Sequence, residues 1–172
     1  MITINELNEG TVETFVRHLG GVFEHSPWVA EQVWELRPFA SAAELHERMM
    51  EQVYAAPESQ VLALLQAHPD LATRMQVTAF SAQEQQGAGL DQLTGEEYEA
   101  FTSMNAQYVS KFGFPFIMAV TGCTKDDIAQ AMRQRMDHDP EREWTQALRE
   151  IARITRIRLG RIVTDRSHEQ KG

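Results

Sequence analysis

Residues 139–162 have the sequence DPEREWTQALREIARITRIRLGRI, and this stretch decides the fold class. Asp139 followed by Pro140 is typical of a helix start, because aspartate caps the first turn and proline fits the first helical position. At about 100° per residue, large apolar side chains form one stripe: Trp144, Leu148, Ile151, Ile154 and Ile162. Three basic residues fall roughly opposite: Arg149, Arg153 and Arg156. We therefore predict one long amphipathic helix with a solvated basic face.

One charged residue, Arg158, falls inside the apolar stripe, seven residues after Ile151. A guanidinium is costly to bury unless an anion or several hydrogen-bond acceptors receive it. Two interpretations follow from the sequence. Either Arg158 forms an internal salt bridge with a carboxylate on a neighbouring helix, or it binds an anion on the floor of a pocket.

The rest of the chain also has helical periodicity and helix-start signals. Ser41–Glu44, Ser81–Glu84 and Thr94–Glu97 match capping boxes, and Glu58–Ala67 has apolar residues at helical spacing. Phe114–Val120 is the one segment that we expect to be extended. No segment alternates with period two for long enough to build a sheet. The predicted fold class is all-α, a single compact multi-helix domain with one extended, non-helical Phe-Gly-Phe-Pro-Phe segment.

Length and charge limit the function classes. A chain of 172 residues predicts one domain over 1–172, with a flexible tail over about 165–172. The net charge of −9 argues against nucleic acid or an anionic membrane surface as the main partner. No secretory signal, membrane-spanning stretch or peroxisomal tail is visible. We therefore expect a cytoplasmic protein that binds neither nucleic acid nor membranes.

Metal-ligand patterns are also missing from the sequence. The single Cys123 excludes an intramolecular disulfide and a zinc site made of several thiolates. None of the six histidines has a partner at a metal-ligand spacing with a third carboxylate ligand. We expect no metal site.

His68 is the first candidate for chemistry. It ends an apolar helix and precedes Pro69, which disfavours helical geometry at His68 itself. An imidazole at a rigid helix–turn junction suits a catalytic group held by a scaffold. The alternative is a histidine that only caps the last helical carbonyls.

Ser81-Ala-Gln-Glu84-Gln85 is the second candidate. In a capping box, the Glu84 carboxylate would bond back to the Ser81 N–H, which is a purely structural role. The same stretch also places a hydroxyl, two amides and a carboxylate at a helix N-terminus, which suits a polar or anionic ligand.

Phe112–Val120 is the third candidate, since it is too apolar for an exposed loop. Gly113 and Pro115 argue against continuing the preceding helix. A buried extended segment has N–H and C=O groups that no helix uses. Those groups either meet other chain segments or bind a planar ligand with amide edges, and the segment could also be a core-filling loop.

Four blocks, taken together, resemble one known family. In chain order they are His68-Pro69-Asp70-Leu71-Ala72, Ser81-x-x-Glu84-Gln85-x-x-Ala88-Gly89-Leu90, Asn105-x-x-Tyr108-x-x-Lys111-Phe112-Gly113-Phe114-Pro115-Phe116-Ile117, and Arg156-Ile-Arg158-Leu159. The chain is similar in these blocks to the 2-oxo-4-hydroxy-4-carboxy-5-ureidoimidazoline (OHCU) decarboxylases of urate degradation. The resemblance runs from about Phe15 to Ile162.

The resemblance implies an all-α domain, usually a homodimer, that works without metal or organic cofactor. It implies decarboxylation of OHCU to (S)-allantoin and carbon dioxide, the last of three steps from urate. His68 would be the proton donor, and Arg158 the cationic contact. The remaining substrate-site residues would be Pro69, Ser81, Ala82, Gln83, Glu84, Gln85, Phe116, Ile117, Met118, Ala119 and Val120. The absence of a peroxisomal tail and of a fused domain favours a stand-alone bacterial enzyme.

The implied roles agree with the chemistry. Loss of carbon dioxide leaves electron density that the substrate's own imine-type and carbonyl groups delocalise, so orientation and one proton are what the protein must supply. His68 suits the proton transfer, and Glu84 would act with it by accepting from the substrate's hydroxyl or ureido N–H groups. Arg158 would meet a carbonyl or ureido oxygen, because pairing the carboxylate too well would slow the reaction.

Two other function classes remain open. One is a cofactor-free lyase or hydrolase that acts on another ureido compound. The other is a non-catalytic helical interaction module, with Trp28, Trp34 and the methionines as its partner surface. Substitution of His68 separates the module from both enzymes, because a binding surface should not depend on that residue.

Overall fold

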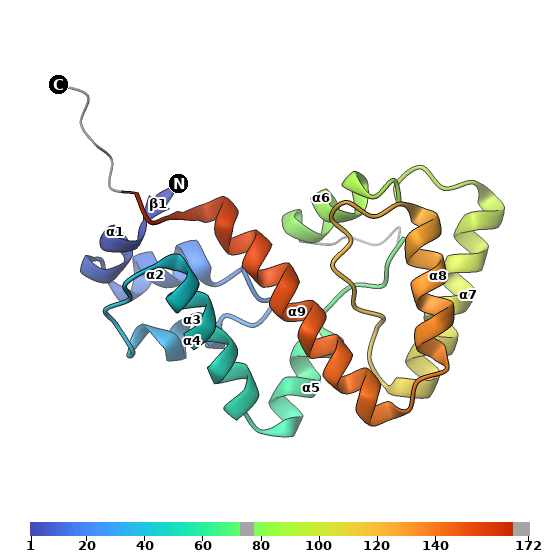
Figure 1. The fold of residues 1–172 in the computed structure, drawn as a ribbon, viewed down its shortest axis with the longest axis horizontal. Coiled ribbons are helices and arrows are strands. Elements are labelled where there is room, and N and C mark those ends of the chain that lie inside the picture. The colour runs from blue at the N-terminus through green and yellow to red at the C-terminus, as the bar shows by residue number, and fades with distance from the viewer. Residues whose placement is uncertain (73–77, 167–172) are drawn as a thin grey trace. The chain divides into compact units, whose positions relative to one another are not determined.

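The computed structural model describes residues 1–72 and 78–166, and most of them are helical (Figure 1). The helices are α1 (Ile4–Glu9), α2 (Val12–Leu19), α3 (Trp28–Trp34), α4 (Ala42–Ala55), α5 (Glu58–Gln66), α6 (Ala79–Gly87), α7 (Gly95–Phe112), α8 (Lys125–Met136) and α9 (Pro140–Ile162). The predicted all-α class is confirmed. No helix among the described residues is long and apolar enough to cross a membrane.

Two compact units divide the chain. Unit 1 contains Met1–Leu64 and the chain from Ala152 onward, and unit 2 contains Leu65–Ile151. Unit 1 includes a short parallel ladder between β1 (Ile2–Thr3) and β2 (Val163–Thr164). The sequence did not predict this ladder, because two residues per strand are too few for a period of two to be visible. Of the predicted tail, 167–172 lie outside the described residues.

In unit 1, α2 packs on α3, and α3 packs on α4. The ring of Phe15 meets Trp34 edge-on, with centroids 5.3 Å apart, and Phe15 is fully buried. Helix α1, which the sequence analysis missed, begins with a capping box in which Thr3 and Glu6 satisfy each other's backbone N–H groups. The signal was present as a Thr-x-x-Glu pattern.

In unit 2, α7 is the longest helix that lies wholly inside the unit, at 18 residues. It begins at the predicted capping box of Thr94 and Glu97 and ends at Gly113, whose φ of 81° is left-handed. Glycine adopts this conformation without strain, and it stops the helix. The Lys111 ammonium donates to the Met136 carbonyl and thereby ties the end of α7 to the end of α8.

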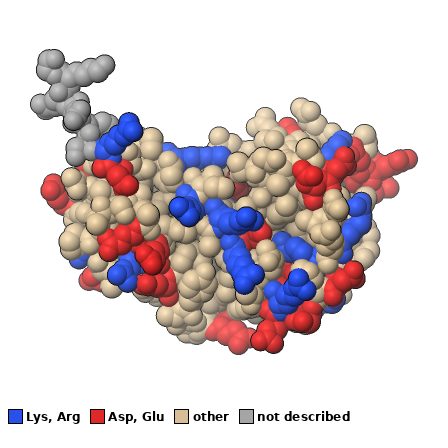
Figure 2. All heavy atoms as spheres, viewed as in Figure 1, with Lys and Arg blue, Asp and Glu red and all other residues tan. Residues whose placement is uncertain are grey.

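The long helix predicted from residues 139–162 is confirmed as α9. The Asp139 carboxylate accepts from the Arg142 N–H at 2.8 Å, which caps the first turn. Ile151 and Ile154 are buried, whereas the predicted basic face is exposed: Arg149, Arg153 and Arg156. Figure 2 shows basic side chains gathered over the middle of the visible face, where Figure 1 draws α9.

Candidate active site

His68 lies in the turn after α5, as its position before Pro69 predicted. Helix α5 ends at Gln66, and the His68 N–H donates to the Leu65 carbonyl at 3.3 Å. The side chain is almost fully buried, with 8 % of the residue exposed. The imidazole is therefore shielded from bulk water and joined to the end of a helix, and its role as proton donor remains a prediction.

The turn that follows His68 is held by a buried amide of α6. Gln85 Oε1 accepts from the Ala72 N–H at 3.0 Å, and Gln85 Nε2 donates to the Asp70 carbonyl at 3.5 Å. Ala72 has a φ of 61°, a left-handed conformation that costs energy outside glycine and needs support from its surroundings. Gln85 therefore fixes the backbone beside His68, and its predicted substrate contact remains a prediction.

A second buried amide, Asn105 on α7, holds the same turn. Asn105 Nδ2 donates to the Leu71 carbonyl at 2.7 Å, and only 5 % of Asn105 is exposed. Its Oδ1 has no hydrogen-bond partner within the part of the chain that the structure describes. Sequence reasoning assigned no role to Asn105, although the residue stands in one of the four blocks.

Helix α6 starts earlier than the sequence predicted. Its N-cap is Thr78, whose hydroxyl accepts from the Ser81 N–H at 3.3 Å. Ser81 therefore stands inside the first turn, and the predicted capping box between Ser81 and Glu84 is wrong. The Ser81-x-x-Glu84 pattern lies inside the helix, and the helix starts at Thr78, which has no Glu or Gln three residues later.

The predicted ligand-binding stretch of α6 has two faces. Ser81 and Gln85, four residues apart, are buried, whereas Ala82 and Gln83 are exposed and Glu84 is half-buried. Residues four apart lie on successive turns of the same helix face, so this face of α6 packs on the protein interior. The catalytic role of Glu84 and the substrate contacts of its neighbours remain predictions.

The segment Phe114–Val120 has no helical turn, as predicted. Figure 1 shows it running without regular structure from the end of α7 to the start of α8. Phe114 and Phe116 are buried. At its start, Gln66 Nε2 donates to the Gly113 carbonyl at 3.0 Å, which ties the segment to the end of α5, two residues before His68.

Two backbone groups of this segment bind charged side chains. The Ile117 carbonyl accepts from Arg135 Nη1 at 2.7 Å, and the Ala119 N–H donates to Glu150 Oε2 at 2.8 Å. The sequence left open whether such backbone groups meet other chain segments or bind a ligand. For the Ile117 carbonyl and the Ala119 N–H, contact with other chain segments is confirmed. The substrate contacts predicted for Phe116–Val120 remain predictions.

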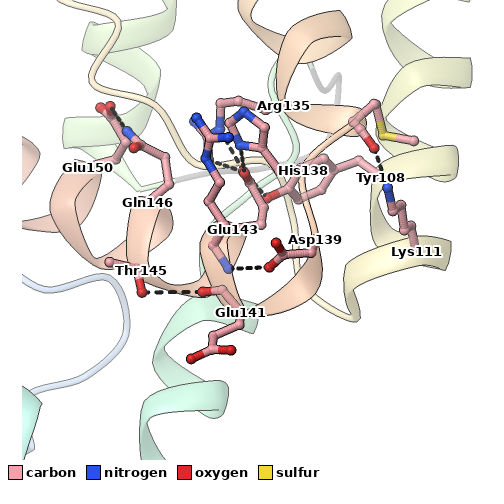
Figure 3. Close-up of polar contacts among 12 residues, drawn as sticks. Tyr108, Lys111, Arg135, His138, Asp139, Glu141, Glu143, Thr145, Gln146 and Glu150 are labelled. Carbon is pink, nitrogen blue, oxygen red and sulfur yellow. Dashed lines mark hydrogen bonds and ion pairs between the residues drawn. The ribbon is translucent and has the colours of Figure 1, made fainter.

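Arg135 belongs to a buried polar cluster that sequence reasoning missed (Figure 3). We call it the Glu143 cluster. The Glu143 carboxylate is fully buried and accepts from Tyr108 Oη and Arg135 Nε, each at 2.6 Å, and His138 Nδ1 lies 3.0 Å from it. Arg135 Nη2 lies 2.5 Å from Glu143 Oε1 without making a hydrogen bond. Burial, and then the Glu143 carboxylate, raise the pKa of Tyr108, so its hydroxyl stays protonated as a donor.

One face of α7 brings the His68 turn and the extended segment together. Asn105 binds Leu71, and Tyr108, three residues later, packs its ring on Phe116 with centroids 5.4 Å apart. Residues at this spacing lie side by side on a helix. The turn and the segment, separated by about forty residues of chain, therefore both contact the same side of α7.

Arg158 belongs to unit 1. Its Nη1 donates to Glu24 Oε2 at 2.9 Å and to the Val22 carbonyl at 3.2 Å, and the residue is 1 % exposed. The salt-bridge interpretation is confirmed, but the carboxylate lies in the loop between α2 and α3 instead of on a helix. The role of Arg158 as a substrate contact remains a prediction.

Comparison with known proteins identifies the family. The family model for OHCU decarboxylase matches residues 8–160. The chain belongs to the OHCU decarboxylase family. Among the relatives of this family member is a 2-oxo-4-hydroxy-4-carboxy-5-ureidoimidazoline decarboxylase of Halalkalicoccus jeotgali, 42 % identical over 99 % of this chain and 97 % of that protein.

A relative from Bacillus subtilis is longer. The uric acid degradation bifunctional protein of that organism is 45 % identical over 99 % of this chain, which spans 34 % of its length. A solved structure, (S)-allantoin synthase, has a TM-score of 0.75 and 31 % identity, over 94 % of this chain and 54 % of that chain. Family members thus occur alone and as part of longer proteins.

The residues that sequence reasoning missed in this OHCU decarboxylase family member are polar groups buried by tertiary contacts. Arg135, Glu143 and Asn105 stand on helices α8, α9 and α7, where local patterns gave no reason to single them out. Asn105 and Tyr108 belong to one of the four blocks that resemble the family, and this membership was the signal that could have singled them out. Within residues 1–72 and 78–166, no three His, Cys, Asp or Glu side chains are grouped as metal ligands.

Proposed function

We propose that this protein decarboxylates OHCU to (S)-allantoin and carbon dioxide, the last of three steps from urate. The observation that carries the proposal is the match to a relative named as this decarboxylase over nearly the full length of both chains. This match favours the OHCU reaction over a lyase or hydrolase for another ureido compound. It also favours an enzyme over a non-catalytic helical module.

His68 is the proton donor in this proposal. Histidine is the side chain that most often transfers a proton near neutral pH, which suits it to this role. The almost complete burial of His68 and the two amides that hold the following turn support a fixed direction of proton delivery. Delivery to one face of the planar intermediate yields one enantiomer of allantoin.

The other predicted groups bind and orient the substrate. Glu84 accepts from the substrate's hydroxyl or ureido N–H groups, and Pro69 and Ser81–Gln85 line the ring. The backbone of Phe116–Val120 meets the amide edges. Arg158 pairs with a carbonyl or ureido oxygen instead of the carboxylate, because a strong carboxylate contact would stabilise the ground state.

The reaction as proposed uses no metal and no organic cofactor. The electron pair left by carbon dioxide is delocalised into the imine-type and carbonyl groups of the substrate itself. The protein's contribution is orientation, charge stabilisation and a proton. We further propose that the protein is a homodimer in a bacterial cytoplasm, and light scattering after gel filtration tests the dimer.

The test of the proposed function is circular dichroism of allantoin formation, with OHCU made in situ from urate by the two preceding enzymes. Wild type should form one enantiomer rapidly, with or without a metal chelator, and His68→Ala should not. A signal no faster than the protein-free decay of OHCU would overturn the proposal. Loss of the wild-type signal with chelator would overturn its metal-free part.

A further inference from the structure

Two neighbouring peptide units, one on each side of Met118, are each held by a buried charged side chain. The Ile117 carbonyl accepts from Arg135, and the Ala119 N–H donates to Glu150. In a planar trans peptide unit, C=O and N–H point in opposite directions. The Met118 N–H therefore points away from the guanidinium of Arg135, and the Met118 C=O points away from the Glu150 carboxylate.

The other two polar groups of these peptide units, an N–H and a C=O, both belong to Met118. Neither the N–H nor the C=O of Met118 has a hydrogen-bond partner in the described ranges, and the residue is partly exposed. A donor and an acceptor on the same residue complement the edge of an amide or ureido group, which offers one C=O and one N–H.

The direction of the Arg135 guanidinium is fixed by its surroundings. Nε bonds Glu143 at 2.6 Å, and the guanidinium carbon lies 4.3 Å from the centre of the Phe116 ring. A planar guanidinium held on one edge and stacked on one face presents its remaining donors in a set direction. Through its bond to the Ile117 carbonyl, Arg135 therefore links the Glu143 cluster to the segment.

Glu150 holds the second peptide unit in a comparable way. Its Oε1 accepts from Gln146 Nε2 at 2.9 Å, while Oε2 receives the Ala119 N–H at 2.8 Å. Figure 3 shows Gln146 and Glu150 side by side on α9. The carboxylate is buried, so water competes little for the backbone N–H.

We propose that Arg135 and Glu150 are positioning residues of the decarboxylase reaction. They orient the peptide units around Met118 so that its N–H and C=O face a ureido or amide edge of the substrate. The inference rests on the proposed function. Neither side chain has to touch the substrate, because each acts through a backbone group.

The first test compares Arg135→Lys with Arg133→Lys, a matched change at an exposed position of α8. Lysine at 135 keeps a cation beside Glu143 but has no planar fork to hold the Ile117 carbonyl as well. Loss of one recognition contact should raise KM about tenfold with little change in kcat. The affinity for (S)-allantoin, measured by calorimetry, should weaken by the same factor, and Arg133→Lys should change neither.

A structural role alone predicts a different result. It would reduce the amount of folded enzyme, so the apparent kcat would fall while KM and the (S)-allantoin affinity stayed at wild-type values. That outcome for Arg135→Lys would overturn the inference. If the wild type itself formed no (S)-allantoin, the proposed function would fail instead, and the two failures are therefore distinguishable.

A second pair of variants keeps the inference testable if Arg135→Lys does not fold. Glu150→Gln retains an oxygen that can accept the Ala119 N–H, whereas Glu150→Leu removes the acceptor at similar size. We expect a KM near wild type for Glu150→Gln and a KM raised about tenfold for Glu150→Leu. Equal KM values for the two variants would overturn the role of Glu150.

Discussion

Two buried arginine–glutamate pairs, one in each unit, use the same contacts in different settings. Arg158 pairs with Glu24 in unit 1, and Arg135 pairs with Glu143 in unit 2. Each arginine also donates to a carbonyl in a non-helical segment, that of Val22 or of Ile117. In both units, therefore, a helix holds an irregular segment through one guanidinium.

The carboxylate in unit 2 lies in a different setting, the Glu143 cluster. Glu143 also accepts from the Tyr108 hydroxyl and contacts His138, so it is the centre of a cluster. The cluster reaches the segment that is proposed to bind substrate. The same kind of ion pair thus holds a loop in unit 1 and, in the proposed function, orients a candidate binding segment in unit 2.

The largest expected effect comes from removing either carboxylate. Glu143→Ala removes the carboxylate that pairs with the buried Arg135, and Glu24→Ala removes the one that pairs with the buried Arg158. Each should lower the free energy of unfolding by about 3–5 kcal/mol, measured by urea unfolding. Glu143→Ala also removes the acceptor of the Tyr108 hydroxyl.

An exposed pair provides the control for this prediction. Arg48 and Glu51 lie 2.9 Å apart on α4, with nearly half of each side chain exposed. Glu51→Ala should change stability little, because water screens an exposed pair. Comparable losses for Glu51→Ala and Glu143→Ala would contradict the importance given to burial.

The next effect separates the two roles considered for Arg158. Arg158→Lys retains a cation beside Glu24 but leaves the Val22 carbonyl without its donor, at a cost of about 1–3 kcal/mol. If Arg158 also contacts substrate, kcat/KM should fall at a temperature where the variant is fully folded. If the folded variant kept full activity, Arg158 would hold the loop of Val22 and Glu24 without contacting the substrate.

A histidine in unit 1 predicts a smaller, pH-dependent effect. Burial and the nearby Arg156 lower the pKa of His46 below its ordinary value of 6.5. The unfolded chain then binds the proton more readily, so the contribution of neutral His46 to stability is present above pH 6.5 and lost as pH falls below it. His46→Gln should reduce the fall in melting temperature between pH 7.5 and about pH 5. An unchanged pH dependence would contradict the assignment.

The smallest effect is expected at Asp70, in the turn after His68. Partial burial raises the pKa of this carboxyl above its ordinary value, although the residue as a whole is exposed. Because the folded pKa is raised, stability falls as pH rises through it. Asp70→Asn should therefore raise the melting temperature slightly at pH 7 and leave it unchanged near about pH 3. A lower melting temperature at pH 7 would contradict this.

The sequence predicted the parts of the fold that depend on local signals. The apolar stripe of α9 and the capping box of α7 gave two helices, and Gly113 with Pro115 indicated the extended segment. Arg158 was visible as a charged residue inside an apolar stripe. The pairing of β1 with β2 was not visible, because two residues per strand carry no periodic signal.

Arg135 gave no such signal, because it stands on a polar helix and is buried only by tertiary contacts. The start of α6 was missed because Ser81 begins a Ser-x-x-Glu pattern, whereas the actual N-cap, Thr78, has no Glu or Gln three residues later. Among the candidate site residues, the position of His68 was predictable from Pro69. The amides of Gln85 and Asn105 that hold its turn bind residues 13 and 34 positions away, beyond the reach of local patterns.

The most direct test of the central claim records carbon dioxide release and the circular dichroism of allantoin on the same reaction mixture. The proposed decarboxylase predicts that both signals rise together, far faster than in the protein-free mixture, and that both are lost in His68→Ala. Carbon dioxide release no faster than without protein would contradict the decarboxylase. Fast release with no excess of one enantiomer would contradict proton delivery by His68.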